Sequence, residues 1–330
     1  MTGDFYVTQS GAEIVPENLK EFGERLIFRP LKVDSEQPLA QFLQKGYVES
    51  DTDVLVAELP DGSHLAVTLK QLSYHHVVQG EVNGDPYMLW FCVACNAGIF
   101  LSPVVKGKTY DFRCVGLYNG MALMEDDQTK SYWTHFDGEC VKGEHQGDYL
   151  EPIGTAEILT VEQAVRLFPD VQIIYKRPSP LQWILWNVLL RRMLTEEGYL
   201  PFIFPQTMGQ EDTRCDRMEL GLGIWSGNKN RFYPTRTVEA LGNMLTDTLD
   251  GKNLLIYIDP AVSVLKAVYT DAKPFEWHED KLLLDNGQII HDGRLQTADG
   301  TLVEQDRPQQ LYVRWYGFSY SFPGCEIYGG

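Results

Sequence analysis

The feature that most constrains the fold of this chain is an internal repeat. Residues 82–91 (VNGDPYMLWF) resemble residues 249–258 (LDGKNLLIYI), which lie 167 positions later. Residues 168–171 (FPDV) resemble residues 322–325 (FPGC) at an offset of 154. Units of this size are too long for a solenoid, whose repeats hold about 20 to 50 residues. The chain of 330 residues is therefore expected to contain two related domains.

Short apolar runs separated by turn residues predict a strand-rich fold. Residues 54–57 and 64–68 flank Asp61-Gly62 and predict a β-hairpin. Residues 277–305 contain several turns of the Asn-Gly or Asp-Gly type and predict a meander of short strands. An amphipathic pattern predicts a helix over residues 160–168. The expected fold class is α+β.

A second predicted helix stands between the two repeats. Ser179 and Pro180 fit its N-cap and first helical position, and Gly198 ends it after about Glu197. Its apolar residues cover most of its circumference, so we expect it to be buried in the protein or in a subunit contact and to join the two halves. The expected division is a lead-in (1–45), a first domain with a Cys-x-x-Cys motif (46–176), the linker helix region (177–205) and a degenerate second copy (206–330).

The charge of the chain excludes some classes of partner. The net charge is -18, and binding to nucleic acid or to an anionic membrane surface needs clustered Lys and Arg. The apolar core of the linker helix is too short to span a bilayer, and residues 1–10 do not resemble a secretory signal. We therefore expect a cytoplasmic protein without a membrane span. A small-molecule substrate and a homo-oligomer are both compatible with the sequence.

The strongest candidate for chemistry is the pair Cys92 and Cys95. A two-residue gap allows both sulfurs to point to one place, which suits a metal ion, a reversible disulfide or a reactive thiolate. A strand-turn-strand context favours a metal, and a thioredoxin-like enzyme would place a helix after the first cysteine. The third alternative is a pair of cysteines that only pack in the core.

Further metal ligands would have to come from distant positions. His135, and His75 in a His75-His76 pair, are the candidates, although most single histidines serve no such role. Sulfur and imidazole together suit a transition metal such as Cu, Fe or Zn. At the offset of 167, Cys92 and Cys95 correspond to Asp259 and Val262, so only the first half holds the candidate ligands.

Other residues are weaker candidates. Tyr118 and Asn119 could form a polar, cofactor-binding rim of the Cys-x-x-Cys site, although Asn119-Gly120 also predicts an ordinary turn. Cys114 and Cys140 could lie near the site or be packed thiols.

Four ordered motifs give the chain a family resemblance. They are residues 91–98 (FCVACNAG), 116–120 (GLYNG), 131–139 (SYWTHFDGE) and 168–170 (FPD). In this order they resemble the DUF3179 family of bacterial and archaeal proteins, here as a tandem duplication. His75 falls where that family often has a histidine before an Asn-Asp pair, which Gln79-Gly80 replaces here. The resemblance implies a set of motifs and no particular reaction.

The sequence supports three hypotheses about function. The leading one is a Cys/His metal site in the first domain, built on Cys92, Cys95, His135 and His75, which could serve a metal-dependent oxidoreductase. The second is a metal-free thiol/disulfide redox protein. The third is a non-catalytic ligand-binding or interaction protein. The sequence leaves open whether the protein is an enzyme.

Overall fold

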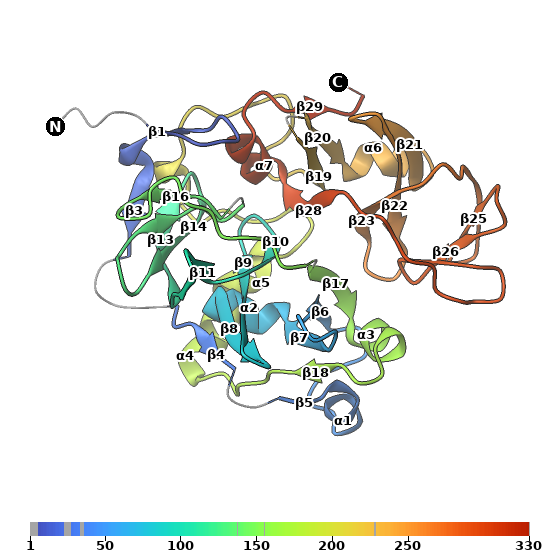
Figure 1. Cartoon of the computed structure of the whole chain (residues 1–330), viewed down its shortest axis with the longest axis horizontal. Coiled ribbons are helices and arrows are strands. Elements are labelled where there is room, and N and C mark those ends of the chain that lie inside the picture. The colour runs from blue at the N-terminus through green and yellow to red at the C-terminus, as the bar shows by residue number, and fades with distance from the viewer. Residues whose placement is uncertain are drawn as a thin grey trace. The chain divides into compact units, whose positions relative to one another are not determined.

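The chain folds into two compact units, Met1–Thr213 and Arg214–Gly330. The computed structural model, drawn in Figure 1, describes residues 6–22, 28–33, 36–136, 138–154, 156–227 and 229–329. Asp137, which belongs to one of the family motifs, lies outside these ranges. Strands dominate both units and helices are short, as the α+β prediction requires.

The described residues of unit 1 form three larger sheets and two short strand pairs. The first sheet has the order β10 (Ala97–Leu101), β9 (Asp85–Cys92), β8 (Val77–Val82), β4 (Leu31–Lys32). The second has the order β16 (Cys140–Lys142), β15 (Tyr132–Trp133), β14 (Met121–Asp126), β13 (Phe112–Tyr118), β3 (Leu19–Glu21). The third has the order β17 (Ala156–Thr160), β6 (Asp53–Glu58), β7 (His64–Thr68), β18 (Gln172–Ile173), β5 (Gln37–Pro38). The pairs are β1 (Tyr6–Val7) with β2 (Glu13–Ile14) and β11 (Val104–Val105) with β12 (Lys108–Thr109).

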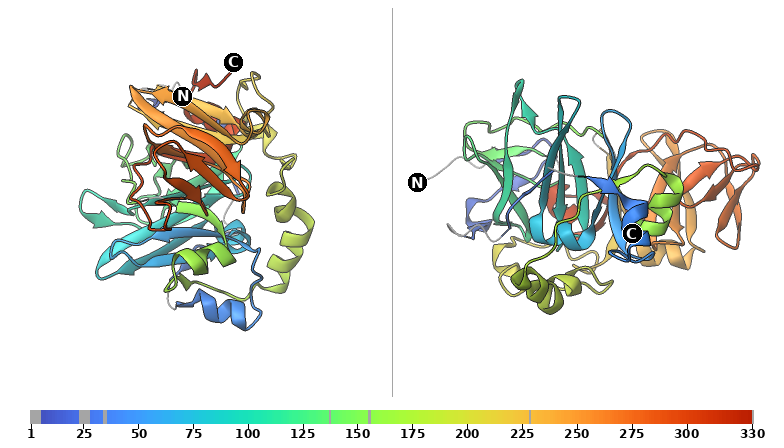
Figure 2. Two further views of the ribbon diagram at one scale, coloured as in Figure 1. Left: turned by 90° about the vertical axis from the view of Figure 1, so that its right-hand side faces the viewer. Right: turned by 90° about the horizontal axis from the view of Figure 1, so that it is seen from below.

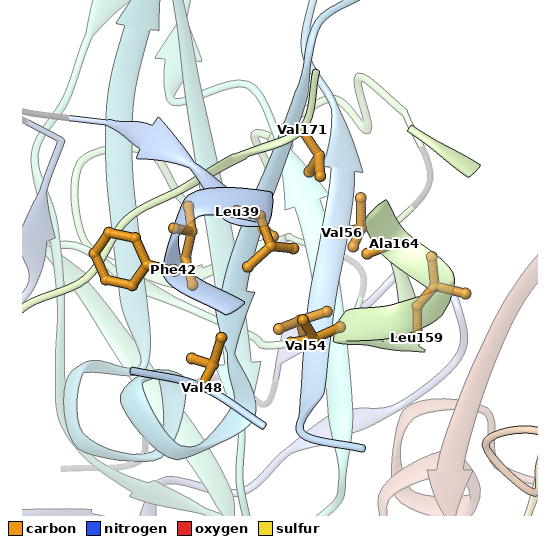
Figure 3. Packing of buried hydrophobic residues seen from close by; sticks show 11 residues of the cluster. Leu39, Phe42, Val48, Val54, Val56, Leu159, Ala164 and Val171 are labelled. Atoms are coloured by element: carbon orange, nitrogen blue, oxygen red, sulfur yellow. The ribbon is translucent and has the colours of Figure 1, made fainter. Parts of the chain in front are cut away.

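Two helices cover one face of the third sheet. They are α1 (Leu39–Gln44) and α3 (Val161–Leu167), which corresponds to the helix predicted over 160–168. Both contribute to one cluster of buried apolar side chains, in which Leu39 and Ala164 face Val54 and Val56 of β6 (Figure 3). Thr160 begins α3 with a capping box, which satisfies the free N–H groups of its first turn. The predicted hairpin of β6 and β7 is confirmed.

The predicted linker helix belongs to unit 1. It is continuous through α4 (Pro180–Leu185), a π-helical turn η2 (Trp186–Leu190) and α5 (Arg191–Met193), and Ser179 caps it as expected. Trp186 of η2 packs edge-on against Tyr74 of α2 (Leu69–His75), with ring centroids 6.3 Å apart. The helix is not buried on all sides within the chain, because Leu181 is 74% exposed and Val188 is 67% exposed, and its burial in a subunit contact stays a prediction. Among the described residues, no helix has both the length and the apolar character needed to cross a membrane.

In the part of unit 2 that the structure describes, the strands form three sheets and there are two helices. The first sheet has the order β28 (Gln309–Arg314), β19 (Leu220–Ser226), β20 (Lys229–Pro234), β29 (Glu326–Ile327). The second is β21 (Met244–Leu249), β22 (Lys252–Asp259), β23 (Val264–Tyr269). The third is the predicted meander, β24 (Pro274–His278), β25 (Lys281–Leu284), β26 (Ile289–His291), β27 (Arg294–Gln296). The helices are α6 (Thr235–Ala240) and α7 (Trp315–Ser321).

The bounds of several elements recur between the units. β21 and β22 begin and end 167 residues after β8 and β9, and β23 begins 167 residues after β10. α7 and β29 lie 154 residues after α3 and β18. Three residues with left-handed backbone in unit 1, His76, Asn83 and Asn96, also have left-handed counterparts at the offset of 167, namely Asn243, Asp250 and Ser263. The repeat seen in the sequence is therefore matched by the same local backbone at the same spacing.

Candidate functional site

The Cys-x-x-Cys motif forms the turn between β9 and β10. Cys92 ends β9 and pairs in register with Ala97, the first residue of β10. Asn96 closes the turn with φ +56°, a left-handed conformation that asparagine tolerates better than most residues. The sulfurs of Cys92 and Cys95 are bonded to each other as a disulfide. The two-residue gap therefore brings the sulfurs together, as the sequence predicted.

The turn lies in the core of unit 1. Cys92 is 2% exposed, Cys95 is fully buried, and Val93 and Ala94 between them are also buried. A buried disulfide is shielded from large reagents, whereas reactive cysteines usually have some exposure. Any exchange partner of this pair must therefore be small, or the turn must open.

His76 contacts the strand that leads into the turn. It follows α2 with φ +57°, and its carbonyl accepts the N–H of Phe91 at 2.8 Å. Its Nδ1 lies 2.8 Å from the carbonyl oxygen of Phe91, the residue before Cys92. Because a carbonyl can only accept, Nδ1 carries the hydrogen. Burial lowers the pKa of His76 to about 4, so the ring is neutral at pH 7. In this tautomer Nε2 carries no hydrogen and can act as an acceptor or a ligand.

His135 contacts the strand that leaves the turn. Its Nε2 lies 3.0 Å from the carbonyl oxygen of Ala97, so Nε2 carries the hydrogen. Burial, with a smaller effect of the neighbouring His76, lowers the pKa of His135 to about 4. The other ring nitrogen, Nδ1, is buried and accepts no hydrogen bond from the described residues. Leaving a buried acceptor without a hydrogen bond costs free energy of folding. This nitrogen is therefore a candidate for a functional contact.

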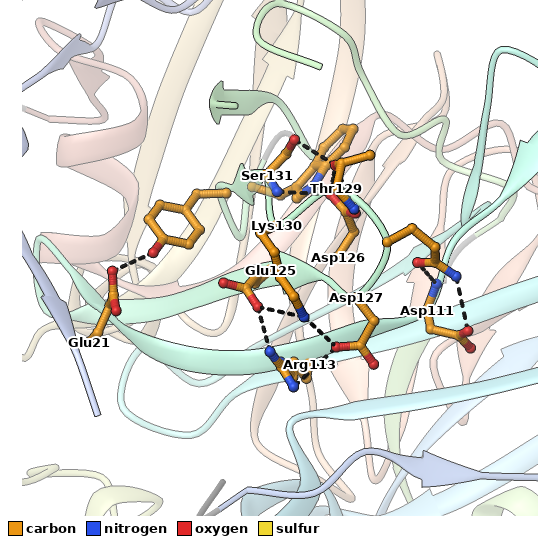
Figure 4. Close-up of polar contacts among 12 residues, drawn as sticks. Glu21, Asp111, Arg113, Glu125, Asp126, Asp127, Thr129, Lys130 and Ser131 are labelled. Carbon is orange, nitrogen blue, oxygen red and sulfur yellow. Dashed lines mark hydrogen bonds and ion pairs between the residues drawn. The ribbon is translucent and has the colours of Figure 1, made fainter. Parts of the chain in front are cut away.

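A hydrogen-bonded loop positions the segment that carries His135. Asp126, at the end of β14, accepts from the backbone N–H groups of Thr129 and Ser131 and from the indole of Trp133 at 3.1 Å (Figure 4). Burial raises the pKa of Asp126, but these hydrogen bonds outweigh it, and the net pKa lies below the ordinary value. The carboxylate thus holds β15 two residues before His135.

His75 points to a different part of unit 1. Its Nδ1 lies 2.6 Å from the carbonyl oxygen of Arg29, and Lys176 acts on it electrostatically. Burial is the main cause that lowers its pKa. Of the two adjacent histidines, the structure thus brings His76 to the backbone beside Cys92. The sequence alone could not separate them, because the difference depends on the pairing of β8 with β9 and on the backbone turn at residue 76.

Tyr118 and Asn119 contact the N-terminal segment. The hydroxyl of Tyr118 accepts the N–H of Val15 at 3.1 Å and donates to the carbonyl of Glu13 at 3.3 Å. Asn119, with φ +48°, accepts from the side chain of Asn18 at 2.8 Å. Both residues lie at the turn between β13 and β14, and their interactions are those of a packed turn.

Cys114 and Cys140 are buried thiols. Each is within reach of a backbone carbonyl only two residues away along the chain, those of Gly116 and Lys142. Burial raises the pKa of each thiol to about 12, which keeps both protonated and unreactive at pH 7.

One group of possible metal ligands lies close together in unit 2. Among the described residues, only Asp280, His291 and Asp292 of unit 2 place three ligand atoms within 4.8 Å of one another. Both ring nitrogens of His291 face these carboxylates, at 3.0 Å and 3.7 Å. With the disulfide formed, Cys92, Cys95, His75 and His135 do not make such a group.

Comparison with known proteins identifies the family. No curated protein and no solved structure matches the chain. The family model described as "Protein of unknown function (DUF3179)" matches residues 36–298, which run through unit 1 and most of unit 2. This match covers most of the chain, and the chain therefore belongs to the DUF3179 family.

Proposed function

We propose that unit 1 carries a reversible thiol–disulfide centre formed by Cys92 and Cys95. The observation that carries the proposal is the sulfur–sulfur bond in a turn flanked by neutral imidazoles. The attacking species in disulfide exchange is a thiolate, which the reductant supplies.

The redox step balances with a dithiol as reductant. One thiolate of the reductant attacks a sulfur of the pair, and the Cys92–Cys95 bond breaks to give a mixed disulfide. The second thiol of the reductant then attacks the reductant's own sulfur in this mixed disulfide and releases the protein thiol. Two electrons and two protons pass to the protein, and the reductant becomes a disulfide. The buried turn favours small dithiols and small oxidants over large protein partners.

The small contribution of the Cys92–Cys95 disulfide to stability is compatible with reversible reduction. A disulfide stabilises mainly by restricting the unfolded chain, and a loop this short contributes only on the order of 2 kcal/mol. Opening it therefore leaves the rest of unit 1 folded, since its core is formed by other residues. A bond kept only for stability would be better placed across a longer loop.

The recurrence between the units supports a functional role. We further propose that both units descend from one duplicated segment, which the matching element bounds and left-handed residues support. The counterpart turn in unit 2 has Asp259 and Val262 in place of the two cysteines, and Asn243 in place of His76. The backbone forms without sulfur there, so the fold does not require these cysteines.

A transition-metal site is the second candidate function. Metal-bound histidines usually donate their other ring N–H to a carbonyl or carboxylate, which is how His76 and His135 are held. After reduction, the sulfurs of Cys92 and Cys95 with Nδ1 of His135 would offer three ligands for Zn, Cu or Fe, and His76 is better placed than His75 for a fourth. Binding would release the two thiol protons.

Thiol counting tests the leading proposal. The native full-length chain is equilibrated anaerobically with dithiothreitol, freed of it, and denatured in the presence of an alkylating reagent for mass analysis. We expect two additional alkylated cysteines, at positions 92 and 95, full reoxidation by oxidised glutathione, and an unchanged near-UV circular dichroism spectrum. Cys114→Ser, which removes a buried thiol outside the turn, is the matched control. A pair that resists reduction until the protein unfolds would overturn the proposal.

Metal titration separates the two candidates. The reduced chain is titrated anaerobically with Co²⁺, whose thiolate complexes absorb strongly in the near ultraviolet. The metal proposal predicts about one equivalent of thiolate-bound Co²⁺ and a weaker site in His135→Ala, while less than about 0.2 equivalents of thiolate-bound Co²⁺ rejects it. Failure of metal binding leaves the redox cycle intact, so the outcomes are distinguishable.

A further inference from the structure

The helix formed by α4, η2 and α5 has an exposed apolar face. Leu181, Ile184 and Val188 follow helical spacing along one side and are 74%, 52% and 67% exposed. Trp183 beside them is 57% exposed. The opposite side is occupied, because Trp186 packs on Tyr74 and Leu190 and Met193 are buried. Figure 2 shows this helix along the outer side of unit 1, and its exposed face marks an interaction surface.

The charge around this face is opposite to that of the chain. Residues 176–193 contain Lys176, Arg177, Arg191 and Arg192, all exposed, and no acidic residue. Lys70 adds a further positive charge, with its Nζ 5.4 Å from the ring centroid of Trp186. The first acidic residues beyond the helix are Glu196 and Glu197, in a chain whose net charge is -18. The net charge of the whole chain therefore does not describe the local charge of this surface.

We propose that this helix docks on an anionic lipid surface, lying in the plane of the membrane with its apolar face in the interface. A helix of 14 residues, about 21 Å long, with exposed Leu, Ile and Trp and basic residues at both ends has the chemistry of an interfacial helix. Tryptophan favours the boundary between headgroups and acyl chains, and each basic residue gains from anionic headgroups.

A second copy of the chain fits the exposed face of this helix less well than an anionic lipid surface does. If two such helices paired antiparallel, Lys176 and Arg177 of one copy would lie beside Arg191 and Arg192 of the other. Parallel pairing would place each basic pair beside its own counterpart. Both arrangements bring like charges together, which an isologous contact cannot avoid. An anionic lipid surface satisfies the apolar face and both basic ends at once.

Vesicle sedimentation of the full-length chain tests the proposal. Vesicles of phosphatidylcholine alone are compared with vesicles that contain phosphatidylglycerol as well. We expect at least tenfold tighter binding to the anionic vesicles, weakened by high salt. Lys176→Gln with Arg177→Gln should weaken binding about 30-fold. Lys45→Gln with Lys229→Gln, exposed lysines elsewhere, should leave it unchanged.

The apolar face is tested with a second pair of variants. Ile184→Ser with Val188→Ser should weaken binding about tenfold or more, because two exposed apolar side chains no longer enter the interface. Leu241→Ser with Phe275→Ser, at exposed positions of unit 2, is the control. Absence of binding to anionic vesicles, or equal binding by all variants, overturns the proposal. A concentration-dependent dimer that Ile184→Ser with Val188→Ser abolishes would identify a second copy as the occupant instead.

Discussion

The turn at residues 92–96 of unit 1 and the turn at residues 259–263 of unit 2 have the same backbone and different chemistry. Each joins two antiparallel strands, and each ends with a left-handed residue, Asn96 or Ser263. In unit 1 the turn is closed by the disulfide. In unit 2, Asp259 accepts the N–H of Ala261 at 3.1 Å and forms a buried ion pair with Lys266 at 2.9 Å.

Comparing the two turns separates the features that the backbone fold requires from the side chains that differ in chemistry. The strand pairing and the left-handed closing residue are common to both turns, so they belong to the fold. The side chains at the first turn position differ in charge, reactivity and partners. The unit 2 turn is held by a buried ion pair, and the unit 1 turn is closed by a disulfide, which we propose a redox reaction opens.

The largest expected effect is at the ion pair of unit 2. Lys266→Met removes the cation that lies 2.9 Å from the fully buried carboxylate of Asp259, and the free energy of unfolding should fall by about 3 to 5 kcal/mol. Denaturant titration measures the change. Lys252→Met, at an exposed ion pair, is the control and should change stability by less than about 0.5 kcal/mol. A small loss at Lys266 would mean that the pair does not hold this turn.

The next effect is a pH dependence carried by unit 1. The pKa of both His76 and His135 is lowered to about 4 in the folded state, so the unfolded chain binds more protons between pH 4 and 6.5. Stability should therefore fall as pH falls through that window, by roughly 2 kcal/mol per histidine between pH 7 and pH 5. His135→Asn should flatten this slope even if it destabilises the protein at pH 7. His278→Asn, at an exposed position, should not, and an unchanged slope in His135→Asn would contradict the account.

Removal of the disulfide should cost less. Cys92→Ala with Cys95→Ala should lower the free energy of unfolding by on the order of 2 kcal/mol, since the loop is short. The same loss should follow reduction of the wild-type chain, and dithiothreitol should have no further effect on the double variant. A loss several times larger would make the bond a structural requirement of unit 1 and set it apart from its counterpart in unit 2.

The smallest effect compares the closing residues of the two turns. Ser263→Gly should raise stability by a few tenths of a kcal/mol, because glycine adopts positive φ more easily than serine. Asn96→Gly should change it by less, because asparagine already tolerates this conformation. Thermal unfolding of both variants measures the difference. A larger gain at Asn96 would show that the two turns are not equivalent.

Local features of the fold could be predicted from the sequence, and features that depend on distant contacts could not. The hairpin around Asp61-Gly62 and the helix start at Ser179-Pro180 follow from nearby residues, and both are present. The choice of His76 over His75 beside the turn depends on strand pairing and on a backbone conformation unusual for histidine. The exposure of Leu181 and Val188 could not be predicted, because an apolar pattern does not say what covers it.

The same limit applies to the candidate site. The proximity of Cys92 and Cys95 follows from their spacing, but the bare Nδ1 of His135 depends on a hydrogen bond to Ala97, 38 residues away. The contacts of Tyr118 and Asn119 could not be predicted for a related reason, and their cofactor-binding role stays a prediction. Their partners, Glu13, Val15 and Asn18, come from a segment whose position the sequence does not reveal.

The reduction potential of Cys92 and Cys95 tests the central claim most directly. The native chain is equilibrated anaerobically at pH 7 in a series of dithiothreitol buffers, quenched by alkylation, and analysed by mass spectrometry of the peptide that contains residues 92–95. We expect a two-electron transition with a midpoint above about −300 mV, in the range of disulfides that cycle. A midpoint well below about −300 mV, or reduction only after unfolding, would contradict the account and make this disulfide a fixed part of the fold.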